Sequence, residues 1–249
     1  MLEKEKLFKE AENAIKWIKE YVEKIGAKGV VVGNSGGKDS ATVIAMATKA
    51  LGKERIVTVA MPCNSIASDL EDAKLVAQKF EVPFVEVDLS NTYNELENSI
   101  NNIKLNKEAK INIKPRLRMT TLYAIAQSLG YLVIGTGNLC ERMVGYTTKW
   151  GDSASDFNPI ANFTVEEVLA IGEYLGVPDK IIHKAPNDGL GGQTDEEKMG
   201  VTYKQIAEYI ETGKTDSEAM KNIEIRNKSS KHKRKQVPVY EIERKKYLE

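Results

Sequence analysis

One short stretch of the chain brings together glycine, hydroxyl, lysine and carboxylate groups. Its eight residues are Gly33, Asn34, Ser35, Gly36, Gly37, Lys38, Asp39 and Ser40. Glycines let a backbone approach a ligand closely, and the N–H groups that open a helix attract phosphate oxygens. Lys38 adds a positive charge, and Asp39 offers an oxygen ligand for Mg²⁺. The stretch therefore predicts a site for nucleotide phosphates. The alternatives are a tight structural turn and, for Asp39, a carboxylate that only caps the helix.

The spacing of these residues excludes two common phosphate loops. A Walker A loop needs a glycine where Val32 stands and a hydroxyl where Asp39 stands. The Gly-x-Gly-x-x-Gly pattern of dinucleotide-binding folds is absent as well. What remains is Ser-Gly-Gly-x-Asp-Ser after a strand, which resembles the pyrophosphate loop of the N-type ATP pyrophosphatases. Those enzymes activate an oxygen by adenylation and release pyrophosphate, so the resemblance implies ATP as a substrate.

Strands and helices alternate around this loop. Short apolar or β-branched segments predict four strands, at Gly29–Gly33, Arg55–Met61, Pro83–Leu89 and Tyr131–Gly135. Apolar residues at helical spacing predict helices at Glu5–Ile25, Lys38–Leu51, Ser68–Phe80, Asn91–Asn106, Pro115–Leu129 and Val165–Leu175. The Ser68–Glu71 spacing predicts a capping box at the third helix. The alternation predicts an α/β fold, a doubly wound parallel sheet in a three-layer sandwich. Residues 145–163 and 184–195 are expected to be long loops that close over the site as lids.

Composition limits the classes of partner. The chain has 249 residues, and its 36 Lys and Arg balance its 36 Asp and Glu, so we expect no nucleic acid and no membrane partner. Neither Cys63 nor Cys140 lies in a Cys-x-x-Cys pair, and only His183 and His232 are available for a zinc site. No signal sequence or spanning segment is evident. We therefore expect one cytoplasmic domain over residues 1–249.

Beyond the loop, several motifs form one continuous pattern. They are Arg116–Tyr123, Leu132–Asn138, Glu141, Gly145–Asp152, Asp156–Ile160, Gly192–Glu197, Gly200–Tyr203 and His232–Arg234. In this order the pattern looks like the ammonia-dependent NAD⁺ synthetases, whose fold is of the adenine nucleotide alpha hydrolase-like type. The resemblance implies that ATP adenylates the carboxylate of deamido-NAD⁺ and that ammonia displaces AMP to give NAD⁺.

The resemblance also implies roles for single residues. It implies ATP contacts from Gly33 through Ser40, and from Thr136 and Asn187. It implies that Asp39 and Glu141 share Mg²⁺ and that, with Lys38, they form the catalytic group. It implies contacts to deamido-NAD⁺ from Arg116, Lys149, Asp156, His232 and Lys233. Each has a simpler alternative: Arg116 as a surface residue, Lys149 and Asp156 as a mutual ion pair, Thr136 as a helix cap.

Two positions depart from the family pattern, and the end of the chain is basic. A family lysine that reaches ATP is replaced by Val165, and a family hydroxyl residue by Asn187. Lys38 and Lys184 are the cations that we expect to compensate. Residues 221–249 carry ten Lys or Arg against four Asp or Glu. This segment is interpreted as a clasp on a phosphate-bearing substrate, with a solvated tail as the alternative.

The nitrogen source and the proton acceptor are less well defined by the sequence. Only about 28 residues precede the synthetase pattern, so we expect ammonia rather than glutamine as the nitrogen source, either free or delivered by a partner. Asp152 or Asp156 is the expected acceptor of the ammonium proton. The family resemblance implies a homodimer. Among enzymes, a tRNA thiolase using Cys140, a lysidine-type ligase and a GMP-synthetase-like amination remain alternatives. A nucleotide-binding regulatory module without chemistry is an alternative of another class; Asp39 together with Glu141 favours an enzyme.

Overall fold

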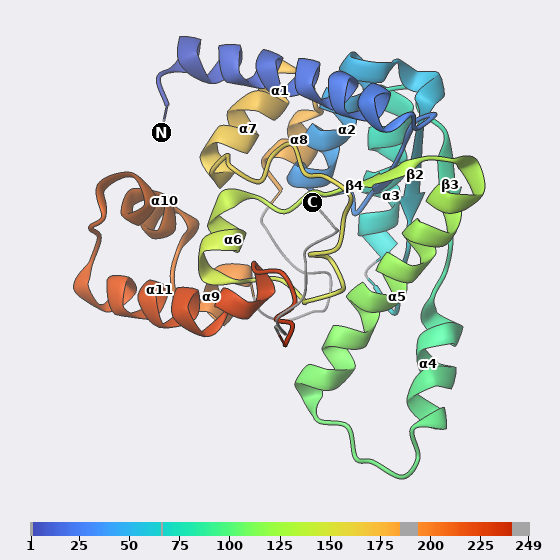
Figure 1. Ribbon diagram of the computed structural model, residues 1–249, viewed down its shortest axis with the longest axis vertical. Coiled ribbons are helices and arrows are strands. Elements are labelled where there is room, and N and C mark those ends of the chain that lie inside the picture. Colours follow the sequence, from blue (N-terminus) through green and yellow to red (C-terminus); the bar gives the residue numbers. More distant parts are fainter. Residues whose placement is uncertain (1, 66, 185–193, 241–249) are drawn as a thin grey trace.

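The sheet at the centre of the molecule has four parallel strands. The computed structural model describes residues 2–65, 67–184 and 194–240 (Figure 1). Its strands are β1 (Val30–Gly33), β2 (Ile56–Ala60), β3 (Phe84–Glu86) and β4 (Leu132–Ile134), in the order β3-β2-β1-β4. Val31 lies opposite both Val57 and Val133, so β1 pairs on both of its edges. This order confirms the predicted parallel, doubly wound sheet.

Alternate strand residues pack against helices on opposite faces. Val30, Val32 and Ile134 face one core, which is built with α1 (Lys4–Ile25), α2 (Lys38–Leu51), α3 (Ala67–Lys79), α7 (Val165–Tyr174) and α8 (Asp179–Ile182). Val31 and Val133 face a second core with α4 (Ser90–Ser99) and α5 (Lys107–Leu129). In Figure 1, α4 and the first half of α5 project from the body as an antiparallel arm. The three predicted layers are therefore confirmed.

Local sequence signals explain the ends of α1 and α2. α1 buries Leu7, Ile18 and Val22 at helical spacing, and it ends where Gly26 adopts a left-handed φ of 76°. α2 begins at Lys38 after Gly37, which has no side chain to cap the helix. A short 3₁₀ turn, η1 (Lys53–Arg55), then leads into β2. Both predicted helices are confirmed at these boundaries.

Two predicted helix starts are wrong. α5 begins at Lys107, where the Asn106 side chain accepts a hydrogen bond from Ala109 N at 2.8 Å, and it runs through Pro115 instead of starting there. The N-cap outweighs the local cost of a proline within the helix. α3 begins at Ala67, so Ser68 lies inside the helix and cannot be its N-cap.

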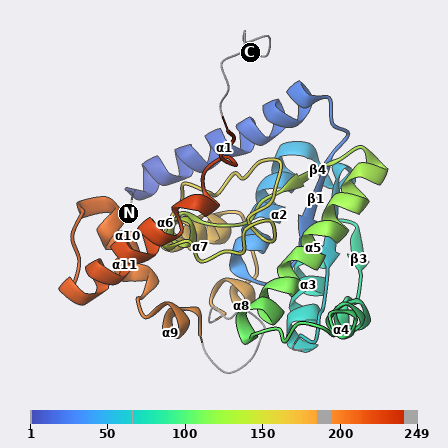
Figure 2. The same cartoon turned by 60° about the horizontal axis from the view of Figure 1, so that its bottom comes forward.

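Several helices from the second half of the chain form a smaller group with its own core. Its helices are α6 (Leu139–Val144), α9 (Asp195–Met199), α10 (Tyr203–Thr212) and α11 (Ser217–Ser229), followed by the 3₁₀ turn η2 (Lys231–Lys233). Cys140, Val144, Met199 and Ile223 are buried together there. Figures 1 and 2 show α9, α10 and α11 on the side of α6 and α7, away from β3. Along the described chain, each helix is too short or too polar to cross a membrane.

Candidate active site

The loop between β1 and α2 is held against α3 by its own first residues. Asn34 donates its backbone N–H to Val59 O at 2.9 Å and its side-chain amide to Ala73 O at 2.8 Å. Gly36 has φ of 71°, and a Cβ on it would lie 2.6 Å from Asp69 O. Only glycine fits this conformation and this space, so the sequence fixes the loop locally.

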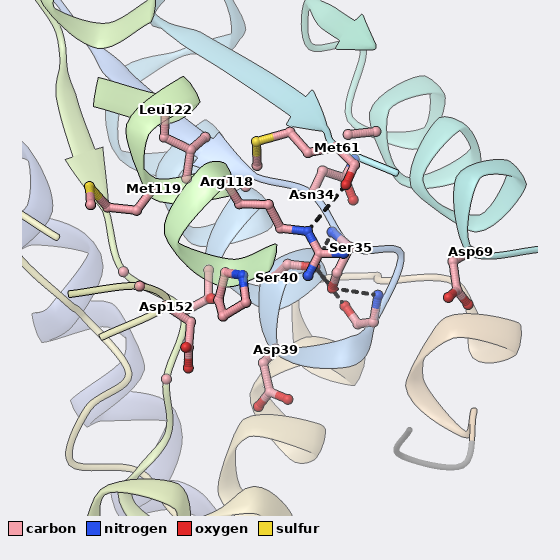
Figure 3. Close-up of a pocket in the computed structure, with 18 of the residues that line it drawn as sticks. Asn34, Ser35, Asp39, Ser40, Met61, Asp69, Arg118, Met119, Leu122 and Asp152 are labelled. Atoms are coloured by element: carbon pink, nitrogen blue, oxygen red, sulfur yellow. Dashed lines mark hydrogen bonds between the residues drawn. The ribbon is translucent and has the colours of Figure 1, made fainter. Parts of the chain in front are cut away.

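Hydroxyl groups order the rest of the loop. The Oγ atoms of Ser35 and Ser40 lie 3.1 Å apart, and Gly37 N donates to Ser35 Oγ at 3.3 Å (Figure 3). Because Gly37 provides no side-chain cap, the first N–H groups of α2 remain suited to a phosphate, and the helix dipole favours an anion there.

A cavity of about 390 Å³ lies over this loop at the carboxyl ends of β1, β2 and β4. Ligands of open α/β sheets bind at this edge, where the strand order reverses. The loop residues form one wall, and residues from several later segments form the others: Met61, Asp69, Arg118, Met119, Leu122, Thr136, Glu141, Tyr146, Asp152, Lys184, Asp195 and Tyr203. Asp39, Arg118 and Asp152 line this space from different elements (Figure 3).

Two carboxylates from separate crossovers meet in the cavity. Asn138 links them: its side-chain amide donates to Asp39 Oδ1 at 3.2 Å, and its backbone N–H donates to Glu141 Oε2 at 2.9 Å. Glu141 is the third residue of α6 and forms a capping box with Asn138. Burial and the nearby Asp39 carboxylate raise the pKa of Glu141 well above its ordinary value. A cation between the two groups would relieve this repulsion.

The residues present fit Mg²⁺. Within the described ranges, His, Cys, Asp and Glu side chains form no group of three or more that could hold a metal ion. Mg²⁺ is commonly held by one or two protein carboxylates, and phosphates and waters complete its shell. Asp39 and Glu141 match that requirement beside a phosphate loop.

Lys38 lies between the Asp39 carboxylate and the ring of Tyr203. Its residue is 8% exposed, its Nζ lies 3.5 Å from Asp39 Oδ2, and the same Nζ lies 5.7 Å from the centre of the Tyr203 ring. Tyr203 and Tyr146 donate to the two oxygens of Asp195, at 3.5 and 2.9 Å. Burial, with Glu141 and Asp195 nearby, raises the pKa of Tyr203, so its hydroxyl stays a donor. These contacts therefore keep the Lys38 ammonium at the cavity wall.

Comparison with known proteins decides the family. A sequence profile of the NAD synthase family matches residues 10–241. The chain belongs to the NAD synthase family. The resemblance predicted from the motifs is confirmed.

Individual relatives and solved structures match most of the chain. The NH₃-dependent NAD⁺ synthetase of Carboxydothermus hydrogenoformans is 43% identical over 228 residues, which is 90% of this chain and 93% of that protein. The structure of an NMN synthetase from Francisella tularensis has a TM-score of 0.91 at 33% identity and covers 95% of this chain and 99% of its own. The NH₃-dependent NAD synthetase from Campylobacter jejuni has a TM-score of 0.79 at 27% identity, with 96% and 100% covered.

The residues expected to contact deamido-NAD⁺ in this family member lie outside the cavity lining. Arg116 donates from Nε and Nη2 to Lys149 O, both at 3.3 Å. The Lys149 ammonium lies 5.3 Å from the centre of the Trp150 ring. Asp156 accepts from Val133 N at 2.7 Å and from the Tyr123 hydroxyl at 3.3 Å. Their contacts to substrate therefore stay predictions.

The C-terminal pair also has contacts of its own. Lys233 donates from Nζ to Gly145 O at 2.8 Å and to Thr147 O at 2.7 Å, whereas the His232 side chain is exposed. Thr136 lines the cavity, and Asn138 rather than Thr136 caps α6. Asn187 and the predicted lid around Gly191 lie outside the described residues.

Of the two positions that depart from the family pattern, Val165 lies among the described residues, and Lys184 is one of the two cations expected to compensate. Val165 is 6% exposed and packs in the same core as Cys140. Lys184 lines the cavity and pairs with Asp69 Oδ1 at 2.8 Å and Asp72 Oδ2 at 2.6 Å. Burial alone would lower the pKa of Lys184, but these two carboxylates raise it above the ordinary value.

Among the residues of the cavity wall that sequence reasoning missed are Arg118, Tyr146, Asp195 and Tyr203. All four lie inside motifs that carried the resemblance, so the motifs contained the signal. The resemblance implies a substrate contact from Arg116, two residues before Arg118. Side chains two residues apart on a helix point to different sides, so only one of the two arginines can face the cavity. Arg118 donates from Nε to Met61 O at 3.1 Å, beside the loop (Figure 3).

Proposed function

We propose that this chain amidates deamido-NAD⁺ with ammonia, consuming ATP and releasing NAD⁺, AMP and pyrophosphate. The observation that carries the proposal is one cavity lined both by the Gly33–Ser40 loop, with Asp39, and by Glu141, in a chain of the NAD synthase family. A carboxylate oxygen is a poor leaving group until it is joined to AMP. Adenylation therefore explains why ATP and an acid substrate must share one site.

Each wall of the cavity has a part in that reaction. The N–H groups that open α2, together with Lys38, stabilise the charge that develops on the departing pyrophosphate. Asp39 and Glu141 would hold Mg²⁺, which neutralises phosphate charge when it is bound. Arg118, beside the loop, adds a further positive charge to this wall. These groups are fixed before substrate arrives, so they need little reorganisation.

Ammonia then attacks the adenylate, and a carboxylate must accept a proton from ammonium. Both oxygens of each acid already accept hydrogen bonds, but Asp152 lines the cavity and Asp156 does not. The geometry therefore supports Asp152 over Asp156. Cys140 is an unsuitable nucleophile for a thiolase, because burial raises the pKa of its thiol to about 12.

The proposed enzyme is a cytoplasmic homodimer. The homodimer is proposed from the resemblance to the family. Sedimentation of the purified chain tests the dimer: a single species at twice 27.7 kDa is the expected result.

The test of the reaction is product analysis. ATP, Mg²⁺, ammonium and deamido-NAD⁺ should give equal amounts of NAD⁺, AMP and pyrophosphate by mass spectrometry. Pyrophosphate should not appear when deamido-NAD⁺ is left out. Release of ADP, or pyrophosphate release without the dinucleotide, would contradict the proposal.

A second candidate is amidation of the mononucleotide, nicotinic acid mononucleotide to NMN. It is favoured by one observation: the superposition with the NMN synthetase is closer, at a TM-score of 0.91, than that with the Campylobacter jejuni NAD synthetase, at 0.79. The relative that is 43% identical carries the NAD⁺ synthetase name and favours the dinucleotide. Comparison of kcat/KM for the two acids decides: the first candidate requires the larger value for deamido-NAD⁺.

A further inference from the structure

Asn138 connects the two acids of the cavity from behind its wall. It is the N-cap of α6 and is 0% exposed. The cavity is lined by Gly137, Asp39 and Glu141 around it, whereas Asn138 itself is not one of the lining residues. Its contribution to the reaction is therefore expected to pass through the two acids.

Helix capping decides which way the Asn138 amide faces. Its Oδ1 accepts from Glu141 N at 3.0 Å, and this N–H belongs to the first turn of α6, where intrahelical partners are lacking. The Nδ2 end is thereby turned to Asp39 Oδ1, 3.2 Å away. A flipped amide would place an acceptor against the carboxylate and a donor against the N–H, and both bonds would be lost. The cap thus gives Asp39 a donor of fixed orientation.

The backbone of Asn138 holds the second acid. Its N–H donates to Glu141 Oε2 at 2.9 Å, which completes the capping box. One oxygen of Asp39 and one of Glu141 are therefore bonded to the same residue. A change in the separation of the two carboxylates would break one of these bonds.

The turn that carries Asn138 is itself fixed on both sides. Before it, Gly137 O accepts from Asn158 Nδ2 at 2.9 Å. After it, Leu139 N donates to Phe163 O at 2.8 Å. Both partners lie in the segment between α6 and α7, so Asn138 is held in place without any ligand.

The two acids need such a residue because of their charge. Two carboxylates that share a buried site repel each other when no cation lies between them. An amide donor opposes this repulsion at Asp39 without adding a full positive charge that would compete with a metal. Mg²⁺ also demands near-ideal octahedral geometry, so carboxylates that are arranged beforehand suit it.

We infer that Asn138 is a positioning residue for the divalent cation: it fixes the separation of Asp39 and Glu141 and so prepares the site that the cation enters. This inference deepens the proposed function and rests on its Mg²⁺ site. Metal binding can be measured without the acid substrate, so the inference and the proposed amidation can be tested separately.

The metal test follows Mn²⁺ binding by electron paramagnetic resonance in the presence of α,β-methylene-ATP. This analogue cannot transfer AMP, because a carbon replaces the bridging oxygen. Asn138→Ser keeps a hydroxyl that caps α6 but has no amide to reach Asp39. It should raise the Kd of Mn²⁺ about tenfold, as expected for a partner that orients metal ligands. An unchanged Kd would overturn the inference.

Nucleotide affinity shows whether the site itself is intact. Calorimetry with α,β-methylene-ATP in EDTA should give the same affinity for Asn138→Ser and the native chain, because the Gly33–Ser40 loop does not depend on the amide. Equal losses of nucleotide and Mn²⁺ affinity would show a general disruption of the site and would overturn the inference.

A matched control comes from the capping box that opens α7. Thr164 is 3% exposed and caps through the same pair of bonds with Glu167, and neither residue lines the cavity. Thr164→Ala should lower the melting temperature and leave Mn²⁺ binding native. Asn138→Ala, which loses both the cap and the amide, should match Asn138→Ser in its Kd. A Kd that rises as much in Thr164→Ala, or that rises only in Asn138→Ala, would assign the effect to capping and overturn the inference.

The kinetic test uses the proposed amidation. Asn138→Ser should need about tenfold more Mg²⁺ for half-maximal pyrophosphate release, with kcat unchanged at saturating Mg²⁺. A kcat lowered at every Mg²⁺ concentration would show a part in the chemistry itself and overturn the positioning role. A native chain inactive on deamido-NAD⁺ would refute the proposed function, and Mn²⁺ binding would still decide the inference.

Discussion

The cavity joins two regions that are built in different ways. The phosphate loop is held by hydrogen bonds of one asparagine to the next strand and helix, and by a glycine: Asn34 bonds to Val59 and Ala73, and a Cβ on Gly36 would clash with Asp69 O. The region around Glu141 and Asp152 is held by charged side chains from far along the chain, such as Lys233 on Gly145. Backbone shape determines the first region, and charged capping of carbonyls determines the second. Asn138 is where the two meet.

The largest expected effect comes from removing one carboxylate from each region. Asp39→Asn and Glu141→Gln should each lower kcat by about a hundredfold or more, because each removes a charge from the proposed Mg²⁺ site. Both amides keep the hydrogen bonds around Asn138, so the fold should persist. Glu71→Gln, at an exposed carboxylate, is the control. Pyrophosphate release measures the effect; near-native turnover in either variant would contradict the metal assignment.

The local character of the first region can be tested at a glycine. Gly36→Ala should destabilise the fold by about 3 kcal/mol, since it adds left-handed strain and a clash with Asp69 O. Gly176, with φ of 77° and open space around it, is the matched position. Gly176→Ala should cost only about 1 kcal/mol. Urea unfolding measures both, and calorimetry should show weakened ATP binding in Gly36→Ala alone. Equal losses of unfolding free energy in Gly36→Ala and Gly176→Ala would mean that the close approach of Gly36 to α3 contributes nothing.

An ion-pair cluster beside the loop gives a pH-dependent test. The Asp72 side chain is 3% exposed and lies 2.6 Å from both Lys180 Nζ and Lys184 Nζ. Burial alone would raise its pKa, but the two lysines bring the pKa below the ordinary 3.8. Its stabilisation is therefore present above that value and is lost as the pH falls through the lowered pKa.

Asp72→Asn should accordingly lower stability by about 2 kcal/mol at pH 7. The difference from the native chain should shrink as the pH falls below 3.8. Asp69→Asn is the control, since Asp69 pairs with Lys184 alone and is more exposed. Urea unfolding from pH 3 to pH 7 measures the difference. A difference in unfolding free energy that stays constant down to pH 3 would contradict the role of the ionised Asp72 carboxylate.

The smallest effect is expected where the C-terminal helices touch Lys38. Tyr203→Leu removes the ring from the lysine and should raise the KM for ATP by about threefold, in line with a cation–π contact of about 0.7 kcal/mol. Tyr203→Phe keeps the ring and should stay within about twofold, with only the hydroxyl bond to Asp195 lost. Equal KM values in both variants would show that the ring does not position Lys38.

The sequence predicted the first region well because its signals are local. Three adjacent valines predict a buried strand, and glycines followed by Lys38 predict the turn and the helix after it. Strand order then brings the end of β4 beside the end of β1, so Thr136 and Glu141 reach the same cavity as Asp39.

The second region could not be predicted in the same way. A side chain that caps a carbonyl more than eighty residues away leaves no periodic pattern, so the contacts of Lys233 and Arg234 could only be anticipated as a basic segment. α5 shows the same limit: the cap at Asn106 extends the helix through Pro115, where local rules place its start. The ATP contact of Asn187 lies beyond the described residues and stays a prediction.

The strand order also has a consequence for the chain as it leaves the ribosome. β1 pairs with β2 soon after both are made, but its other neighbour begins only at Leu132. A nascent chain that stops before this residue leaves Val30–Val32 as an open, apolar sheet edge, which is a template for pairing with another copy. The last strand to arrive removes that hazard, and with Val133 and Ile134 it also completes the wall of the nucleotide cavity.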